Sequence, residues 1–235
     1  IPAISPLTPI TAIAPLVFVV FLSMARDGIE NYNRYLSDKV VNGRKVDVFD
    51  EEQGKLKRRM WEDVRVGDLI RVHDRESIPA DLLLLSSNHG DGSCHLDTMN
   101  LDGETNLKRK VPQQATVTFQ NMHDEELRSV LQQVMLECEE PTESLHRFNG
   151  NLHLGDDVIL PVDENQLLLR GATLRNTNWV LGLAVYTGND TKEMLGAKDS
   201  KFKRSNIEVQ VNELILLVFG FQVVLAFIAG IIGGL

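Results

Sequence analysis

Residues 102–108 read Asp-Gly-Glu-Thr-Asn-Leu-Lys, and this short stretch decides how the whole chain is interpreted. It is a run of turn-forming and polar residues with one carboxylate, Glu104, near its centre. A short apolar segment, Cys94–Leu96, precedes it, and two longer apolar segments lie near the ends of the chain. The pattern predicts an exposed loop in a soluble region that two apolar segments flank.

Glu104 is the candidate catalytic residue of this loop. Hydrolysis of an acyl phosphate needs an acceptor that orients the attacking water and takes its proton, and such help from a carboxylate is worth roughly 10²- to 10⁴-fold. Gly103 would let the backbone approach another domain closely, and Asp102 is expected to bond to the loop backbone. Thr105 offers a hydroxyl. Lys108 is expected to neutralise phosphate charge or to pair with an acidic neighbour.

The same residues also have a simpler explanation. Asp-Gly beside polar residues is above all a turn signal, and a single glutamate in a loop is usually a solvated charge. The sequence offers no partner nucleophile and no glycine-rich phosphate loop, and the spacing of His89, His95 and His153 is not that of metal ligands, so we expect no metal site. The local chemistry alone therefore leaves the reaction undetermined.

The composition narrows the class of protein. The chain has 235 residues and a net charge of -9, which argues against a nucleic-acid partner because such proteins carry basic stripes. Its two cysteines, Cys94 and Cys138, are far apart in the sequence. They indicate no disulfide framework and are typical of a reducing compartment.

The two apolar segments predict membrane helices at residues 1–26 and 213–235, each joined to the centre by a linker, at 27–43 and 196–212. Basic residues lie on the inner side of both segments, which places the central region in the cytosol by the positive-inside rule. These basic residues are Arg26, Arg34, Lys39, Lys198, Lys201, Lys203 and Arg204. The first segment is not a signal peptide, because no positive charge precedes it.

The central region, residues 44–195, predicts a compact and mostly β domain. Strand patterns occur at residues 45–49, 60–72, 82–85, 152–154, 158–162, 167–169 and 171–186. An insertion at about 112–147 contains apolar residues at helical spacing and predicts an amphipathic helix over Asp124–Glu140. A turn at Thr187–Asp190 is expected to cap a short helix that begins near Thr191.

Several motifs in order resemble the actuator domain of the P-type ATPases, and most closely the type-IV branch, the phospholipid flippases. The motifs are Val66–Ile70, Ile78–Asp81, Asp102–Thr105, Leu169–Thr177 and Thr187–Lys192. The Asn106-Leu107-Lys108 extension, the insertion and the prolines of residues 1–16 are similar to the flippase branch in particular. The resemblance implies a distorted, jelly-roll-like β domain with a helical insertion, flanked by two transmembrane helices.

The resemblance also assigns roles to residues. It implies that Glu104, with Asp102, Gly103 and Thr105, forms the loop that dephosphorylates the enzyme. It implies that Asn106 and Lys108 contact the phosphorylation domain. Ser5, Thr8 and Thr11 are candidates for contact with a lipid headgroup, although Ser and Thr in membrane helices more often bond to their own backbone. The Ile78–Asp81 motif is expected to be structural, with Asp81 tying the backbone.

The family also carries an Asp-Lys-Thr-Gly phosphorylation motif, which this sequence lacks. The chain thus resembles the second membrane helix, the actuator domain and the start of the third membrane helix of a larger enzyme. That enzyme would use ATP and Mg²⁺, neither bound by this chain alone, to move a phospholipid to the cytosolic leaflet. The resemblance implies an integral membrane protein of a eukaryotic Golgi, endosome or plasma membrane, with an accessory β-subunit as an expected partner.

Two other interpretations stay open at this stage. One is a P-type ion pump, against which the extension after Thr105, the long insertion and the first helix argue. The other is a non-catalytic, membrane-tethered domain that binds partners. An intact Glu104 in the loop argues against this second interpretation.

Overall fold

The computed structural model describes residues 9–50, 52–122, 124–131, 134–155, 158–198 and 206–233. It divides the chain into two compact units, Ile1–Ala197 and Lys198–Leu235. The helices are α1 (Pro9–Asn42), α2 (Met99–Asp102), α3 (Asp124–Leu131), α4 (Lys192–Lys198) and α5 (Asn206–Gly233), with 3₁₀ turns η1 (Trp61–Asp63), η2 (Gln114–Asn121) and η3 (Gly188–Asp190). The strands are β1 (Lys45–Asp50), β2 (Lys55–Met60), β3 (Leu69–His73), β4 (Asp81–Ser87), β5 (Cys94–Asp97), β6 (Lys108–Lys110), β7 (Val134–Cys138), β8 (Asn149–Leu154), β9 (Val158–Asp163), β10 (Leu167–Leu168), β11 (Thr173–Arg175) and β12 (Trp179–Tyr186).

The two long helices lie at either end of the chain. Pro9 opens α1, a position at which its missing N–H is not needed. The residues expected as a linker at 27–43 continue α1 as far as Asn42. The Gly43 N–H after its end donates to the Lys39 carbonyl at 3.0 Å. Within the residues that the structure describes, neither α1 nor α5 is long and apolar enough to cross a membrane. The structure therefore does not show the two expected spans.

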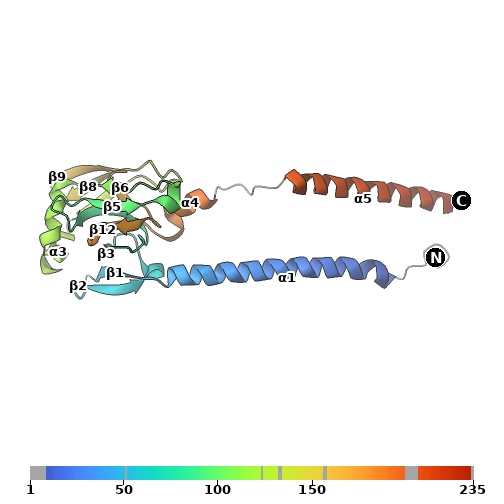
Figure 1. The fold of residues 1–235 in the computed structure, drawn as a ribbon, viewed down its shortest axis with the longest axis horizontal. Helices are drawn as coiled ribbons and strands as arrows, with labels where there is room; N and C mark the ends of the chain where they lie inside the picture. Colours follow the sequence, from blue (N-terminus) through green and yellow to red (C-terminus); the bar gives the residue numbers. More distant parts are fainter. Residues whose placement is uncertain are drawn as a thin grey trace. The chain divides into compact units, whose positions relative to one another are not determined.

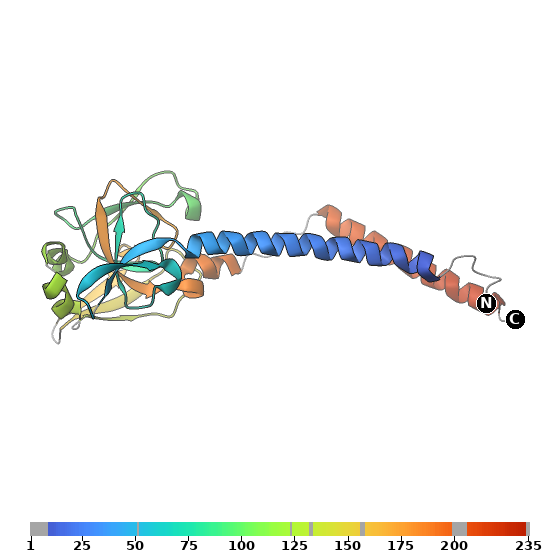
Figure 2. The same cartoon turned by 90° about the horizontal axis from the view of Figure 1, so that it is seen from below.

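Most of the remaining residues form one β domain, which Figures 1 and 2 show from two sides. Its main sheet has six strands in the order β10-β4-β12-β3-β1-β2, and every pairing in it is antiparallel. The apolar run predicted as a buried strand at Leu82–Leu85 lies in β4, all of whose residues are buried. The mostly β character expected from the sequence is thus confirmed.

Strand β4 is apolar throughout because both of its faces are covered. Leu82 and Leu84 belong to one hydrophobic core, whereas Leu83 and Leu85 belong to a second. Successive side chains of a strand point to opposite faces of the sheet. The main sheet therefore separates two cores, and a continuous apolar run is what a doubly covered strand needs.

Two smaller sheets cover these cores. The sheet β11-β5-β6 contributes Cys94, Leu96 and Leu174 to the first core. The sheet β7-β8-β9 contributes Leu152 and Val162 to the second. The domain is thus layered, and strand β5 brings the chain from the first core directly to the loop around Glu104.

The insertion is less helical than the sequence predicted. The helix expected over Asp124–Glu140 ends at Leu131, and residues Val134–Cys138 form strand β7 instead, paired with β8. In this segment Val134, Leu136 and Cys138 pack toward the second core, while Met135 and Glu137 are exposed. The apolar residues of Val134–Cys138 fit the period of a strand as well as that of a helix. The hydrogen-bonded pairing with β8 stabilises the strand.

Candidate functional site

The loop that carries Glu104 connects β5 to β6 in the small sheet β11-β5-β6. Both of its ends are fixed, because Leu96 of β5 pairs with Lys108 of β6 and the Asp97 carboxylate accepts the Met99 N–H at 3.1 Å. The first half of the loop is the single helical turn α2, from which Leu101 packs against the first core. The fold therefore anchors the loop on one side and leaves the rest of it at the surface.

Asp102 is the residue that ties the loop together, as predicted. Its carboxylate accepts the Glu104 N–H at 2.9 Å, the Thr98 hydroxyl at 3.0 and 3.1 Å, and the Lys108 ammonium at 2.6 Å. The bond from Lys108, with those from Glu104 and Thr98, lowers the pKa of Asp102 to about 2. The carboxylate in turn raises the pKa of Lys108. Asp102 is therefore ionised at neutral pH and serves as a fixed acceptor.

Gly103 ends the helical turn in a left-handed conformation, with φ of 77°, and its N–H donates to the Met99 carbonyl at 3.0 Å. Glycine adopts this conformation without the strain that a side chain adds. A Cβ atom built at Gly103 would have no other heavy atom within 4 Å. Within this chain the glycine is thus required by the backbone turn and not by crowding.

Glu104 follows this turn and points its carboxylate outward. Its side chain is 61% exposed, compared with 16% for Asp102 and 26% for Lys108. The Lys108 ammonium lies 3.2 Å from the Glu104 carboxylate. Thr105 and Asn106 are exposed beside it. The loop thus presents an accessible carboxylate on a base that Asp102 and Lys108 hold in place.

The remaining predicted site residues are far from this loop in the sequence. Ser5 and Thr8 lie outside the described residues. Thr11 lies in α1. The sequence missed Thr98, whose hydroxyl holds both oxygens of Asp102. A threonine directly before a turn is a familiar capping signal and was the cue for it.

Three of the other motifs meet at Asp81, which is fully buried at the start of β4. Its carboxylate accepts the backbone N–H groups of Arg170 and Lys192, both at 2.8 Å. Burial raises the pKa of Asp81, although the two backbone bonds and the nearby Lys192 charge oppose this effect. The prediction that Asp81 ties the backbone is confirmed, and the motifs around residues 78–81, 169–177 and 187–192 are parts of one junction.

Lys192 is a second buried residue of this junction to which the sequence assigned no role. It is fully buried, and its ammonium donates to the carbonyls of Arg147 and Ser144 at 2.7 and 3.1 Å and to the Thr142 hydroxyl at 3.1 Å. Burial lowers the pKa of this lysine. Lys192 therefore fastens the end of the insertion to the start of α4.

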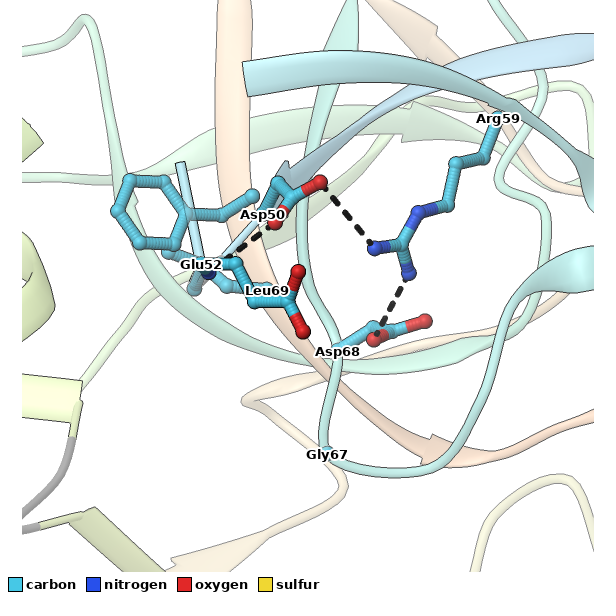
Figure 3. A pocket seen from close by; sticks show the side chains of 7 residues that line it. Asp50, Glu52, Arg59, Gly67, Asp68 and Leu69 are labelled. Carbon is cyan, nitrogen blue, oxygen red and sulfur yellow. Dashed lines mark hydrogen bonds and ion pairs between the residues drawn. The ribbon is translucent and has the colours of Figure 1, made fainter. Parts of the chain in front are cut away.

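The motif at Val66–Ile70 borders a hollow of about 400 Å³ at the edge of the main sheet, shown in Figure 3. The Arg59 guanidinium lies there between two carboxylates, 3.9 Å from Asp50 and 3.6 Å from Asp68. Asp68 also accepts the Arg65 N–H at 2.7 Å. These contacts join β2 to the end of β1 and to the turn before β3, so the motif acts as a structural tie between these three segments.

Across the part of the chain that the structure describes, no group of three histidine, cysteine or acidic side chains is placed to hold a metal ion. The residues that the structure places in the candidate loop fit a different task. They combine one accessible carboxylate, Glu104, with a rigid acceptor and an ammonium. Such a loop can position a water and take a proton from it, provided that a substrate is brought to it.

The chain is similar to known proteins over most of its length. A model of the P-type ATPase actuator domain matches residues 41–192. The chain is 43% identical over 228 residues to phospholipid-transporting ATPase 6 of Arabidopsis thaliana, a match that covers 97% of this chain and 18% of that protein. It is 42% identical over 237 residues to the probable phospholipid-transporting ATPase 11 of the same plant. That match covers 99% of this chain and 19% of that protein.

A fungal relative matches equally fully. The chain is 38% identical over 231 residues to phospholipid-transporting ATPase DRS2 of Saccharomyces cerevisiae, a match that covers 98% of this chain and 17% of that protein. The chain thus spans about a fifth of the length of these relatives. From the match to the actuator domain and the extent of these similarities, the chain belongs to the P-type ATPase family, and residues 41–192 are its actuator domain.

Proposed function

We propose that this chain is the actuator region of an ATP-driven phospholipid translocase, in which Glu104 positions the water that hydrolyses an aspartyl-phosphate intermediate. The observation that carries this proposal is the accessible Glu104 carboxylate, which stands on a loop whose base Asp102, Lys108 and Thr98 hold fixed. A base that must reach a phosphate on another domain has to be exposed in the chain that carries it. It also has to be held so that its position is reproducible.

The chemical step needs little from this chain beyond Glu104. The phosphoaspartate would be brought to the loop, and a water in line with the phosphorus would donate a hydrogen bond to the Glu104 carboxylate at about 2.6–3.2 Å. As the water oxygen bonds to phosphorus, its proton passes to Glu104 and the bond between phosphorus and the aspartate oxygen breaks. The products are inorganic phosphate and a free aspartate. Thr105 and Asn106, which are exposed beside Glu104, would contact the phosphorylation domain.

The choice of a phospholipid as the transported substrate is supported by the names of the relatives, all of which are phospholipid-transporting ATPases. The lipid would move from the outer or lumenal leaflet to the cytosolic leaflet of a Golgi, endosomal or plasma membrane. Residues 1–26 and 213–235 would lie in that membrane with the actuator domain in the cytosol. ATP and Mg²⁺ would bind to parts of the enzyme outside this chain, and an accessory β-subunit would be a partner.

The linkers next to the actuator domain, at 27–43 and 196–212, would couple its rotation to the membrane helices. The support for this coupling is connectivity: α1 continues through residues 27–42 as one helix, and α4 begins at the junction of Asp81 and Lys192. A continuous helix transmits a displacement along its axis without a hinge. Coupling requires that both linkers act on the same conformational equilibrium, and double-mutant cycles across the two linkers would measure this.

The test uses the full-length parent enzyme, purified with lipid in detergent and loaded with radiolabelled ATP. The level of acid-stable phosphoenzyme is followed in the wild type, in Glu104→Gln and in the control Glu125→Gln, whose side chain is exposed on α3. We expect a transported phospholipid to speed the loss of phosphate in the wild type and the control but not in Glu104→Gln. Decay of the Glu104→Gln phosphoenzyme at the wild-type rate would refute the catalytic role. Acceleration by a metal ion in place of any phospholipid would instead favour an ion pump.

A further inference from the structure

Glu104 belongs to a cluster of three charged groups whose members differ in how firmly they are held. The Lys108 ammonium lies between two carboxylates, 2.6 Å from Asp102 and 3.2 Å from Glu104. Asp102 and Lys108 are mostly covered, whereas Glu104 is mostly exposed. The cluster therefore consists of a mostly covered pair, Asp102 and Lys108, and one exposed carboxylate, Glu104.

The ammonium is held in place from two directions. Its backbone lies in β6, where Lys108 pairs with Leu96 of the central strand β5. Its charged end is bound to Asp102, which is itself held by the Thr98 hydroxyl and the Glu104 N–H. A single exposed ion pair is typically worth only about 0–1 kcal/mol. This ammonium, in contrast, has a second and shorter charge-assisted bond that fixes its position.

We propose that Lys108 is a positioning residue: its ammonium, anchored on Asp102, sets the orientation of the Glu104 side chain before the loop meets the phosphoenzyme. This inference rests on the proposed function, because it presumes that Glu104 is the base. A glutamate side chain has several rotamers in solution, and a base that is misplaced by about 1 Å can lose up to about 100-fold in rate. The ammonium would select the rotamer in which one Glu104 carboxylate oxygen lies against Lys108 and would leave the other oxygen free for water.

The neighbouring basic residues cannot take over this task. Arg109 is the next residue of β6, and its guanidinium pairs with Asp91 at 2.5 Å. The Lys110 ammonium donates to the Glu164 carbonyl at 2.6 Å. Among the described residues, Lys108 is therefore the charged group that contacts the Glu104 carboxylate, and Asp102 contacts the same ammonium. Arg109 is a matched control because it is basic, exposed and adjacent in the same strand.

Removing the ammonium has a consequence that a purely structural role would not have. Without Lys108, the Glu104 side chain loses the ion pair that holds it in its orientation in this structure. The slowing should therefore depend on the Glu104 carboxylate and should disappear when that carboxylate is removed.

The experiment measures decay of the lipid-stimulated phosphoenzyme at neutral pH in the full-length enzyme. For Lys108→Met and Lys108→Gln we expect decay to slow by about 10- to 100-fold. Lys108→Arg should restore most of the rate, and Arg109→Met should behave as the wild type. In each variant, the amount of phosphoenzyme formed shows whether the protein has folded. In a Glu104→Gln background, Lys108→Met should add little further slowing, because both changes act through one group.

Three results separate this inference from the proposed function. If Glu104→Gln is trapped as phosphoenzyme while Lys108→Met and Lys108→Gln keep the wild-type rate, the positioning role is wrong and the proposed function stands. A slowing by Lys108→Met that is equally large with and without Glu104 would likewise overturn the positioning role. If Glu104→Gln decays like the wild type, the proposed function fails and the inference fails with it.

Discussion

Replacing Asp81 with asparagine tests whether the junction of three motifs stabilises the actuator domain. Asp81 is fully buried, and each of its carboxylate oxygens accepts one backbone N–H, from Arg170 and from Lys192, at 2.8 Å. Asparagine has nearly the same shape but presents an NH₂ group in place of one oxygen. That NH₂ group would face a backbone N–H, so two buried donors would be left without acceptors.

The magnitude follows from two opposing effects. Loss of a hydrogen bond to a charged group costs about 1.5–3 kcal/mol, and a buried donor left without a partner costs about 1–3 kcal/mol. The amide is neutral and is cheaper to bury than the carboxylate, whose raised pKa shows the effect of its burial. We therefore expect Asp81→Asn to lower the free energy of unfolding by about 2–4 kcal/mol, out of a typical total of about 5–15 kcal/mol.

Equilibrium unfolding in denaturant, followed by tryptophan fluorescence, measures this loss. Trp61 packs against the first core and Trp179 against the second, so the emission reports on both layers of the domain. The control is Asp190→Asn, which changes an exposed carboxylate in the same motif as Lys192 and should alter stability by no more than about 0.5 kcal/mol. Equal stability of Asp81→Asn and Asp190→Asn would refute the reasoning.

Four further changes test other parts of the domain. Gly103→Ala should cost about 1–2 kcal/mol in unfolding free energy, because φ of 77° strains a side chain although the space is open, and the denaturation midpoint measures it. Gly182→Ala should cost about 1–3 kcal/mol by overpacking, because its Cβ would lie 2.9 Å from the Leu82 Cβ, and the melting temperature reports this. The pKa of Asp102 is lowered to about 2, so its stabilising effect is complete above about pH 4 and is lost as the pH falls toward 2. Asp102→Asn should therefore flatten the acidic part of the stability curve, as measured by denaturation at a series of pH values. Lys192→Met removes the ammonium that binds residues 142–147, so amide exchange in that segment should become faster than in the wild type.

The sequence predicted correctly those elements whose residue pattern is strongly apolar or whose contacts are local. The apolar run of β4 indicated a buried strand because four consecutive leucines follow directly after the proline-containing turn Ile78–Asp81 and form a run too short for a typical helix. The role of Asp102 as a loop tie followed from turn chemistry, which acts over two or three residues. Such local or strongly biased patterns can be interpreted without knowledge of distant partners.

The features that sequence reasoning missed depend on partners far along the chain. Strand β7 exists because Val134–Cys138 pairs with β8, a contact that the apolar spacing alone does not distinguish from a helix. Lys192 is buried because the carbonyls of Ser144 and Arg147 receive its ammonium, 45–48 residues away in the sequence. A lysine normally signals an exposed position, so its burial can be recognised only when the acceptors are known.

The motifs at Val66–Ile70, Ile78–Asp81 and Asp102–Thr105 contain carboxylates that differ in their hydrogen bonds. Asp68, Asp81 and Asp102 each accept at least one backbone N–H, so the fold holds each of these side chains in place. Glu104 differs from these three aspartates. In the described part of the chain its carboxylate contacts the Lys108 ammonium and is otherwise open to solvent. A group that must accept a proton during a reaction needs a free lone pair and access for water. The other three carboxylates are held by backbone N–H groups of the fold, whereas Glu104 keeps acceptor sites open to solvent, and this difference supports the proposal that Glu104 is the base.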